Sequence, residues 1–251
     1  MLAAKRRQII AKLIRQQTSV QVSDLCARLG ASPSTIRRDL EHLEQQKVLE
    51  RTYGGAVLVT ADPILKPPPS PSLDPEKERI GAAAAELIGE GETVFVGPGT
   101  TTMAVARHLA AKEGVTVVTD ALDVASYLTH HSQLPVILTG GQVERQETAL
   151  LGHVAELTLR ELRADRAVLG VGGIHVTEGI TGERLSAVRF MRIVIDLMPE
   201  VILVADHRKW GRVGPAFLAP LEAIDMIVTD TKAPSAMVWD LSELGIKIIQ
   251  V

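Results

Sequence analysis

Two groups of side chains in this 251-residue chain are of the types that bind phosphate groups. The first group lies near the N-terminus, where Ser34, Thr35, Arg37 and Arg38 fall within a few residues. Hydroxyl and guanidinium groups at the start of a short helix reach the phosphates and base edges of double-stranded DNA. The alternative is a solvent-exposed basic face on an ordinary helix. These residue types alone leave both interpretations open, and the surrounding elements favour DNA.

The second group is a turn rich in glycine and threonine at residues 97–102, directly after the β-prone residues 93–96. Glycine lets the backbone approach an anion, the following helix N-terminus offers free N–H groups, and threonine adds hydroxyl donors. The turn therefore predicts a cradle for a phosphate group. A tight strand-to-helix turn also needs glycine for conformational reasons, which is the structural alternative.

A helix that begins at Pro33 positions the first group. Ser32 is a favoured N-cap residue, and proline suits the first helical position because its missing N–H would be unpaired there. Ile36, Leu40 and Leu43 recur at helical spacing and form one buried stripe. Side chains off this stripe, with two from a following hairpin, form the expected DNA-binding set: Ser32, Ser34, Thr35, Arg37, Arg38, His42, Arg51 and Tyr53.

The preceding segment predicts the first helix of a helix-turn-helix. Val22, Leu25 and Leu29 repeat at helical spacing, and Gly30 is placed to end that helix. Two helices joined by a turn of about three residues, the second of them polar and basic, form this motif.

The following segment predicts a hairpin. The β-prone residues 48–53 and 56–59 flank the pair Gly54 and Gly55. Behind a helix-turn-helix such a hairpin is a wing, and we expect Arg51 and Tyr53 to lie along the phosphate backbone or enter the minor groove. A purely structural hairpin is the alternative.

The charge distribution agrees with a DNA-binding head. Residues 1–60 hold ten Lys or Arg and five Asp or Glu, a net charge of +5, whereas the remaining residues hold 17 and 25, a net charge of −8. A basic head on an acidic body suits one polyanion-binding domain joined to a different one.

Composition excludes several other classes of protein. The single cysteine permits no internal disulfide and favours a reducing compartment. No apolar run of about 18 residues appears, so we expect no membrane partner and a cytoplasmic location. The seven histidines show no spacing to acids or to the cysteine that makes a ligand set, so we expect no metal centre and no cofactor.

A proline-rich segment divides the chain. Six of the residues 61–75 are proline, which makes this stretch extended and stiff. We therefore predict a winged helix-turn-helix domain at 1–60, a linker at 61–75 and a second domain at 76–251.

Residues 76–251 alternate between apolar strand-like runs and helical patterns, which predicts an α/β domain with a mostly parallel sheet covered on both faces. Ligands of such sheets bind at the C-terminal ends of the strands. Glycine and polar residues follow several predicted strands there. They make up the expected effector-binding set: Gly97, Gly99, Thr100, Thr101, Thr102, Asp120, Gly140, Gly141, Gly172, Gly173, Asp206 and Lys209.

These motifs closely resemble the DeoR family of bacterial transcription regulators. Residues 27–40 and 49–56 resemble the family's N-terminal signature, and residues 99–102, 118–122, 138–141 and 227–230 resemble its C-terminal sensor domain. The resemblance spans nearly the whole chain. It implies a winged helix-turn-helix joined to a Rossmann-like domain of the ribose-5-phosphate isomerase and CoA-transferase type.

The resemblance also implies a function. It indicates a repressor of carbohydrate-metabolism genes that binds operator DNA as a homo-oligomer and responds to a phosphorylated sugar. One alternative is a sugar-phosphate isomerase-like enzyme, but the general base such chemistry needs is absent from the turn at Gly172 and Gly173, so we expect no catalytic residue. The other alternative is a DNA-binding protein whose C-terminal domain only oligomerises.

Overall fold

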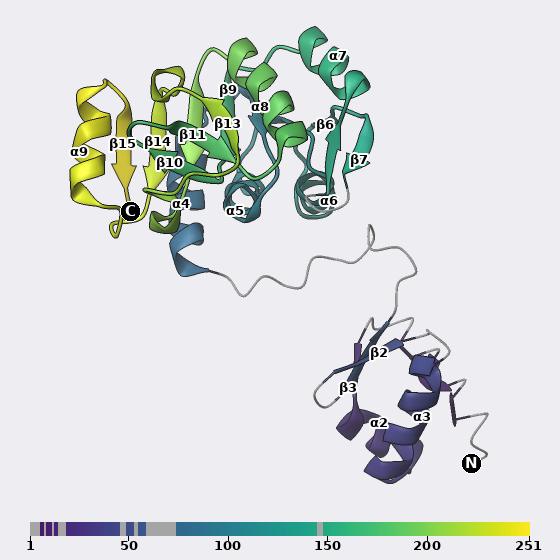
Figure 1. Cartoon of the computed structure of the whole chain (residues 1–251). Helices are drawn as coiled ribbons and strands as arrows, with labels where there is room; N and C mark the ends of the chain where they lie inside the picture. The colour runs from purple at the N-terminus through teal and green to yellow at the C-terminus, as the bar shows by residue number, and fades with distance from the viewer. Residues whose placement is uncertain are drawn as a thin grey trace. The chain divides into compact units, whose positions relative to one another are not determined.

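The computed structural model describes residues 6–7, 9–11, 13–14, 19–45, 49–52, 55–58, 74–144 and 148–251. The chain divides into two compact units, Met1–Lys66 and Pro67–Val251, here called the N-terminal unit and the C-terminal unit (Figure 1). Most of the expected linker at 61–75 lies outside the described residues. The domain boundaries placed there therefore stay predictions.

The N-terminal unit has the helix-turn-helix and hairpin that the sequence predicts. Its antiparallel sheet has the order β1-β3-β2. Gly30 takes the left-handed conformation (φ 60°) that ends the first helix of the motif, and its N–H donates to the Cys26 carbonyl at 3.0 Å. The elements are β1 (Ser19–Gln21), α2 (Val22–Leu29), α3 (Pro33–Gln45), β2 (Leu49–Thr52) and β3 (Gly55–Leu58), and the described residues among 6–14 are also helical.

One apolar core holds the N-terminal unit together. Ile36, Leu40 and Leu43, the stripe predicted on α3, are all buried. They pack with Ile10 and Ile14 of the preceding helical segment and with other apolar side chains of the unit. The stripe thus fixes which face of α3 points to solvent.

The C-terminal unit is built on a seven-stranded sheet of order β15-β14-β12-β9-β4-β5-β6, and all its neighbouring strands are parallel. This confirms the predicted α/β fold class. The strands are β4 (Thr93–Val96), β5 (Thr116–Thr119), β6 (Val136–Leu138), β9 (Arg166–Gly170), β12 (Val201–Val204), β14 (Met226–Thr229) and β15 (Lys247–Gln250).

Helices cover both faces of this sheet. Alternate side chains of each strand enter two separate cores: Phe95 joins the core that includes residues of α7, α8 and α9, while Val94 and Val96 join the core under α4, α5 and α6. The helices are α4 (Pro75–Glu86), α5 (Thr100–Leu109), α6 (Leu122–His131), α7 (His153–Glu161), α8 (Leu185–Leu197) and α9 (Ser235–Glu243). Among the described residues, no helix combines the length and apolarity needed to cross a membrane.

Two small antiparallel sheets add to the predicted architecture. Their strands are β7 (Gln142–Glu144), β8 (Ala149–Leu151), β10 (Gly173–His175), β11 (Gly179–Gly182) and β13 (Ala216–Ala219). The strand order around β4 matters for function, because the chain passes from β4 to β5 on one side and returns at β9 on the other. Loops that leave β4 and β9 diverge at this switch point and open a crevice, which is where open α/β sheets bind ligands.

Candidate functional site: an exposed helix and a strand-end cavity

The exposed face of α3 carries the expected DNA-binding side chains. Ser32, Ser34, Arg37 and Arg38 are exposed, and Thr35 and His42 are partly exposed. The Ser32 hydroxyl accepts from the Thr35 backbone N–H at 3.4 Å and lies 2.8 Å from the Thr35 hydroxyl. Ser32 therefore acts as the predicted N-cap and holds the start of α3 in place.

A buried carboxylate fixes α3 from behind. Asp39 is 2% exposed and contacts Arg6 at 2.5 Å and Arg7 at 2.9 Å. Burial opposes ionisation of Asp39, but the hydrogen bonds and charges of the two arginines outweigh it and lower the pKa of this carboxyl. These two arginines thus have a structural partner. Sequence reasoning missed this pairing, because the residues are more than 30 positions apart.

The wing is described only in part. The backbone of Arg51 lies in β2, which pairs with β3 in antiparallel register. Tyr53 lies outside the described residues. The DNA contacts assigned to these two residues stay predictions.

The C-terminal unit contains a cavity of about 420 Å³ at the C-terminal ends of β4, β9 and β12. This volume is in the range of small-molecule sites. Among the expected effector-binding residues, those that line it are Gly99, Thr100, Thr101, Gly172 and Lys209. The turn after β4 and the turn after β9 therefore meet at one ligand-sized space, as the sequence predicted for strand ends.

The N-terminus of α5 points into this space with its backbone donors. Gly99 is the N-cap, with a φ of 136° that a side chain would strain. The first intrahelical bond runs from the Met103 N–H to the Gly99 carbonyl at 2.9 Å, so the N–H groups of the preceding residues have no helical acceptor. Such a helix start favours an anion.

Other expected effector residues are placed outside the cavity lining. The Thr102 hydroxyl donates to the Gly99 carbonyl at 2.9 Å, Asp120 is 1% exposed, and Asp206 caps the 3₁₀ helix η2 (His207–Lys209). Gly97, Gly140, Gly141 and Gly173 are also absent from the cavity lining, and the roles of all these residues as ligand contacts stay predictions.

Glycine at two of these positions has a packing reason. A Cβ on Gly173 would lie 2.2 Å from the Arg212 carbonyl oxygen, and one on Gly141 would lie 2.6 Å from that of Leu151. Both values are far below any real contact. Close backbone approach is therefore one reason for glycine at both positions, and it leaves their predicted ligand contacts untested.

The cavity also contains charged side chains that the sequence analysis did not select. Lys77 lines it from the first turn of α4, and its ammonium lies 2.6 Å from the Thr100 hydroxyl. Asp123 lines it from the first turn of α6, and burial raises the pKa of this carboxyl. No local pattern marks either residue, since a charged side chain in a first helical turn is usually solvated.

Two arginines and two glutamates stand at or near the cavity as pairs. Arg184 bonds Glu144 at 2.6 Å, and Arg212 bonds Glu183 at 2.7 Å. Arg184 and Glu183 line the cavity. Their charges are balanced within the protein. Lys77 has a longer ion pair, 3.9 Å from Asp206, and Lys209 has no ion pair among the described residues, so these two lysines are the lining cations best placed to attract an anionic ligand.

A winged helix-turn-helix joined to an α/β domain of this kind is the architecture of a DNA-binding transcription regulator. The DeoR-like helix-turn-helix domain matches residues 6–62, and the DeoR C terminal sensor domain matches residues 74–231. The chain belongs to the DeoR family of transcriptional regulators.

Relatives of similar length match nearly the whole chain. The chain is 32% identical to the putative aga operon transcriptional repressor of Escherichia coli O157:H7, covering 99% of this chain and 94% of that protein. It is 31% identical to the glycerol-3-phosphate regulon repressor of Escherichia coli K12 over 99% of each chain. It is also 31% identical to the repressor GlcR of Bacillus subtilis, covering 99% and 96%. These relatives are named as regulators rather than enzymes.

Solved structures show a more distant likeness. Ribose 5-phosphate isomerase from Plasmodium falciparum is 14% identical, with a TM-score of 0.39 over 53% of this chain and 52% of that one. At this level the likeness concerns the fold alone, and no activity follows from it.

Proposed function

We propose that the chain is a cytoplasmic, homo-oligomeric repressor of carbohydrate-metabolism genes, and that a phosphorylated sugar in the C-terminal cavity changes its affinity for operator DNA. The observation that carries the proposal is the cavity at the sheet's switch point, with a helix N-terminus and two lysines in its lining. The names of the relatives, repressors of the aga operon and of the glycerol-3-phosphate regulon, support both the repression and the class of effector.

The phosphate group is assigned to the end of the cavity at α5. Backbone N–H groups of the first turn, the Thr100 and Thr101 hydroxyls and the Lys77 and Lys209 ammonium groups are its donors. Within the described residues, no carboxylate lies within ion-pair distance of the Lys209 ammonium. A phosphate dianion in the cavity would supply the negative charge that pairs with this ammonium.

The sugar part is assigned to the remainder of the cavity. The Asp123 carboxyl and Thr181 offer polar atoms there, while Val171, Met191 and Leu218 supply apolar contacts. A carboxyl or hydroxyl group pairs with sugar hydroxyls, and apolar surface packs against the sugar's carbon face. This division suits a compact, polar ligand with one strongly charged end.

Ion pairs connect the phosphate end to the first turn of α4. Lys77 lies 3.9 Å from Asp206, and Asp74, the N-cap of α4, bonds Arg208 at 2.7 Å. A phosphate that draws the Lys77 ammonium away from Asp206 changes this contact between α4 and η2. Because α4 directly follows the proline-rich segment in the chain, its first turn is the place where effector binding affects the N-terminal unit. The effector shifts DNA binding only to the extent that it binds one arrangement better than the other.

The exposed face of α3 is assigned to operator DNA. Arg37 and Arg38 are exposed on the side opposite the buried stripe, with the small hydroxyl residues at the helix start. A second copy of the chain would present the same helix to a second half-site, since symmetric dimers match repeated half-sites.

Isothermal titration of the full chain with sugar phosphates and their unphosphorylated parents tests the effector site. We expect at least one phosphorylated sugar to bind and its parent to bind more than tenfold more weakly. Thr101→Asp places a negative charge at the phosphate end and should abolish binding, whereas Thr101→Ser keeps the hydroxyl and should retain it. Unchanged binding by the Thr101→Asp variant would place the phosphate elsewhere. No binding by any sugar phosphate would contradict the proposed effector and leave the domain as an unassigned sensor or an oligomerisation domain.

A further inference from the structure

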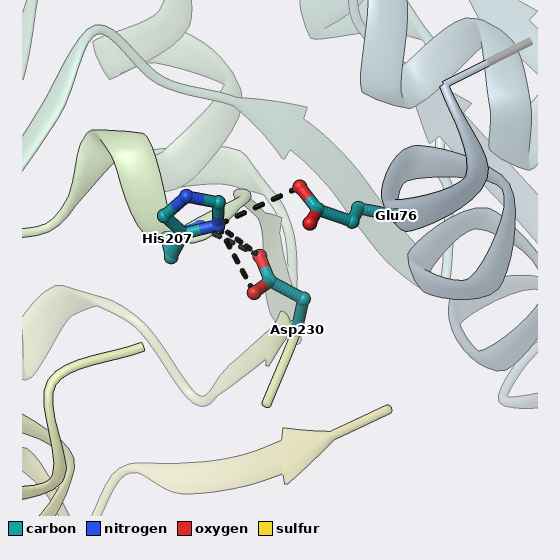
Figure 2. A group of neighbouring side chains, drawn as sticks. All are labelled: Glu76, His207 and Asp230. Atoms are coloured by element: carbon teal, nitrogen blue, oxygen red, sulfur yellow. Dashed lines mark hydrogen bonds and ion pairs between the residues drawn. The ribbon is translucent and has the colours of Figure 1, made fainter. Parts of the chain in front are cut away.

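Three potential metal ligands from distant parts of the chain meet beside the α4–η2 contact (Figure 2). Glu76 lies in the first turn of α4, His207 begins η2, and Asp230 directly follows β14. Their carboxylate and imidazole atoms point toward one another in Figure 2. From the sequence we expected no metal centre, because no histidine has a spacing to acids or to the cysteine that makes a ligand set.

The distances fit a tetrahedral ion. His207 Nδ1 lies 3.1 Å from Asp230 Oδ1 and 3.6 Å from Glu76 Oε2, and one ligand atom from each residue falls within 4.8 Å of the others. Two ligands at the usual Zn–N and Zn–O distances in a tetrahedral site are about 3.3 Å apart. Both separations from His207 Nδ1 therefore lie close to this spacing, and the carboxylate oxygens of Glu76 and Asp230 lie within 4.8 Å of each other.

Neighbouring groups hold the ligands in orientation. Asp230 is fully buried, and its two oxygens accept from the His207 N–H at 2.7 Å and the Lys232 N–H at 2.9 Å. The Lys232 ammonium bonds Glu76 Oε1, which leaves Oε2 directed toward His207. Partners that orient ligating carboxylates in this way are a general property of metal sites.

We propose that Glu76, His207 and Asp230 form a binding site for a divalent transition-metal ion of the zinc class. One imidazole nitrogen and two carboxylate oxygens suit Zn²⁺ and its neighbours, whereas Mg²⁺ and Ca²⁺ favour oxygen ligands alone. The alternative is an ion pair in which a protonated imidazole bridges the two carboxylates without any metal. This proposal is independent of whether the cavity binds a sugar phosphate.

The proposed metal site lies where three elements of the C-terminal unit meet. A metal ion there would fasten the first turn of α4 to η2 and to the end of β14. The same 3₁₀ helix carries Lys209, which lines the cavity. Metal binding would therefore stabilise the contact on which the proposed effector response depends.

The experiment uses the full chain after removal of metal with a chelator. Titration calorimetry with Zn²⁺, with Mg²⁺ as a comparison, gives the affinity and stoichiometry, and the visible spectrum of the Co²⁺ form reports the geometry. The test variants are His207→Gln and Glu76→Gln. The matched control is His108→Gln, because His108 Nε2 faces Glu78 at 3.4 Å but the two are not part of a three-ligand group among the described residues.

We expect one Zn²⁺ per chain, a tetrahedral Co²⁺ spectrum and no comparable binding of Mg²⁺. Each test variant should weaken Zn²⁺ binding at least tenfold, because loss of even a residue that only orients a metal ligand costs about that factor, whereas the control keeps wild-type affinity. Added Zn²⁺ should raise the Tm of the wild type and of the control but not of the test variants. Absence of stoichiometric uptake, or equal uptake by wild type and His207→Gln, would overturn the proposal and identify the cluster as an ion pair only.

Discussion

Replacing Asp39 by asparagine should strongly destabilise the DNA-binding unit while leaving the stability of the C-terminal unit unchanged. The carboxylate is 2% exposed and contacts Arg6 and Arg7, whose side chains are 12% and 31% exposed. Removing one member of a buried ion pair costs about 3–5 kcal/mol. The partial exposure of both arginines places Asp39→Asn near the lower end, at about 3 kcal/mol. A core of this size supplies only about 3–5 kcal/mol in total, so the loss is nearly complete.

Urea denaturation followed by two probes measures this effect. Both tryptophans, Trp210 and Trp239, lie in the C-terminal unit, so their fluorescence follows that unit alone, whereas far-UV circular dichroism follows both. With an m-value of about 1 kcal/mol/M, a loss of 3 kcal/mol moves the midpoint of the N-terminal unit by about 3 M. The fluorescence midpoint should not move.

Asp240→Asn is the control for this prediction, because it makes the same chemical change on an exposed helical residue. It should leave both transitions and operator binding unchanged. If Asp39→Asn kept the wild-type circular dichroism transition and full DNA affinity, the buried ion pair would not be what positions α3, and the reasoning would be refuted.

Three further outcomes follow from the same structure. Arg37→Ala should weaken operator binding by about 1–3 kcal/mol, roughly 5- to 150-fold in Kd, in an anisotropy titration. Arg189→Ala is the control. An equal loss of affinity on all DNA sequences would indicate that Arg37 contacts a phosphate instead of reading a base. Lys209→Met should weaken binding of the sugar phosphate by about 1.5–3 kcal/mol in calorimetry and leave binding of its unphosphorylated parent unchanged. Unchanged affinity for the sugar phosphate would show that Lys209 does not contact the phosphate group. The folded-state pKa of Asp39 is lowered, so its contribution to stability is fully present above the ordinary value of 3.8 and is lost as the pH falls through the folded-state pKa. The urea midpoints of wild type and Asp39→Asn should therefore converge only below about pH 3.8. Convergence at higher pH would contradict this pairing.

The sequence predicted the elements whose patterns are long or strongly marked. Helix α3 begins at Pro33 as expected, its apolar stripe is buried, and β4 has the predicted bounds. These features depend on local spacing and capping, which the chain displays directly. The strand ends that follow β4 and β9 could also be anticipated, because parallel strands place their C-terminal ends at one edge.

The features that were missed depend on contacts between distant residues. Strands β7, β8 and β10 have only three residues each, too few for an alternating pattern to stand out. Lys77 belongs to the cavity only because α4 packs beside the start of α5. The meeting of Glu76 with His207 likewise requires the completed fold.

The measurement that tests the central proposal most directly is fluorescence anisotropy of the full chain on DNA from upstream of its own gene and the adjacent operon. The titration is made at fixed salt, since protein–DNA affinity depends steeply on ionic strength, with and without a panel of sugar phosphates. We expect saturable binding whose Kd is changed by one phosphorylated sugar, and the Thr101→Asp variant should bind DNA normally but lose that change. Saturable binding that no sugar phosphate alters would contradict the proposed effector control and leave only the DNA-binding role of the N-terminal unit.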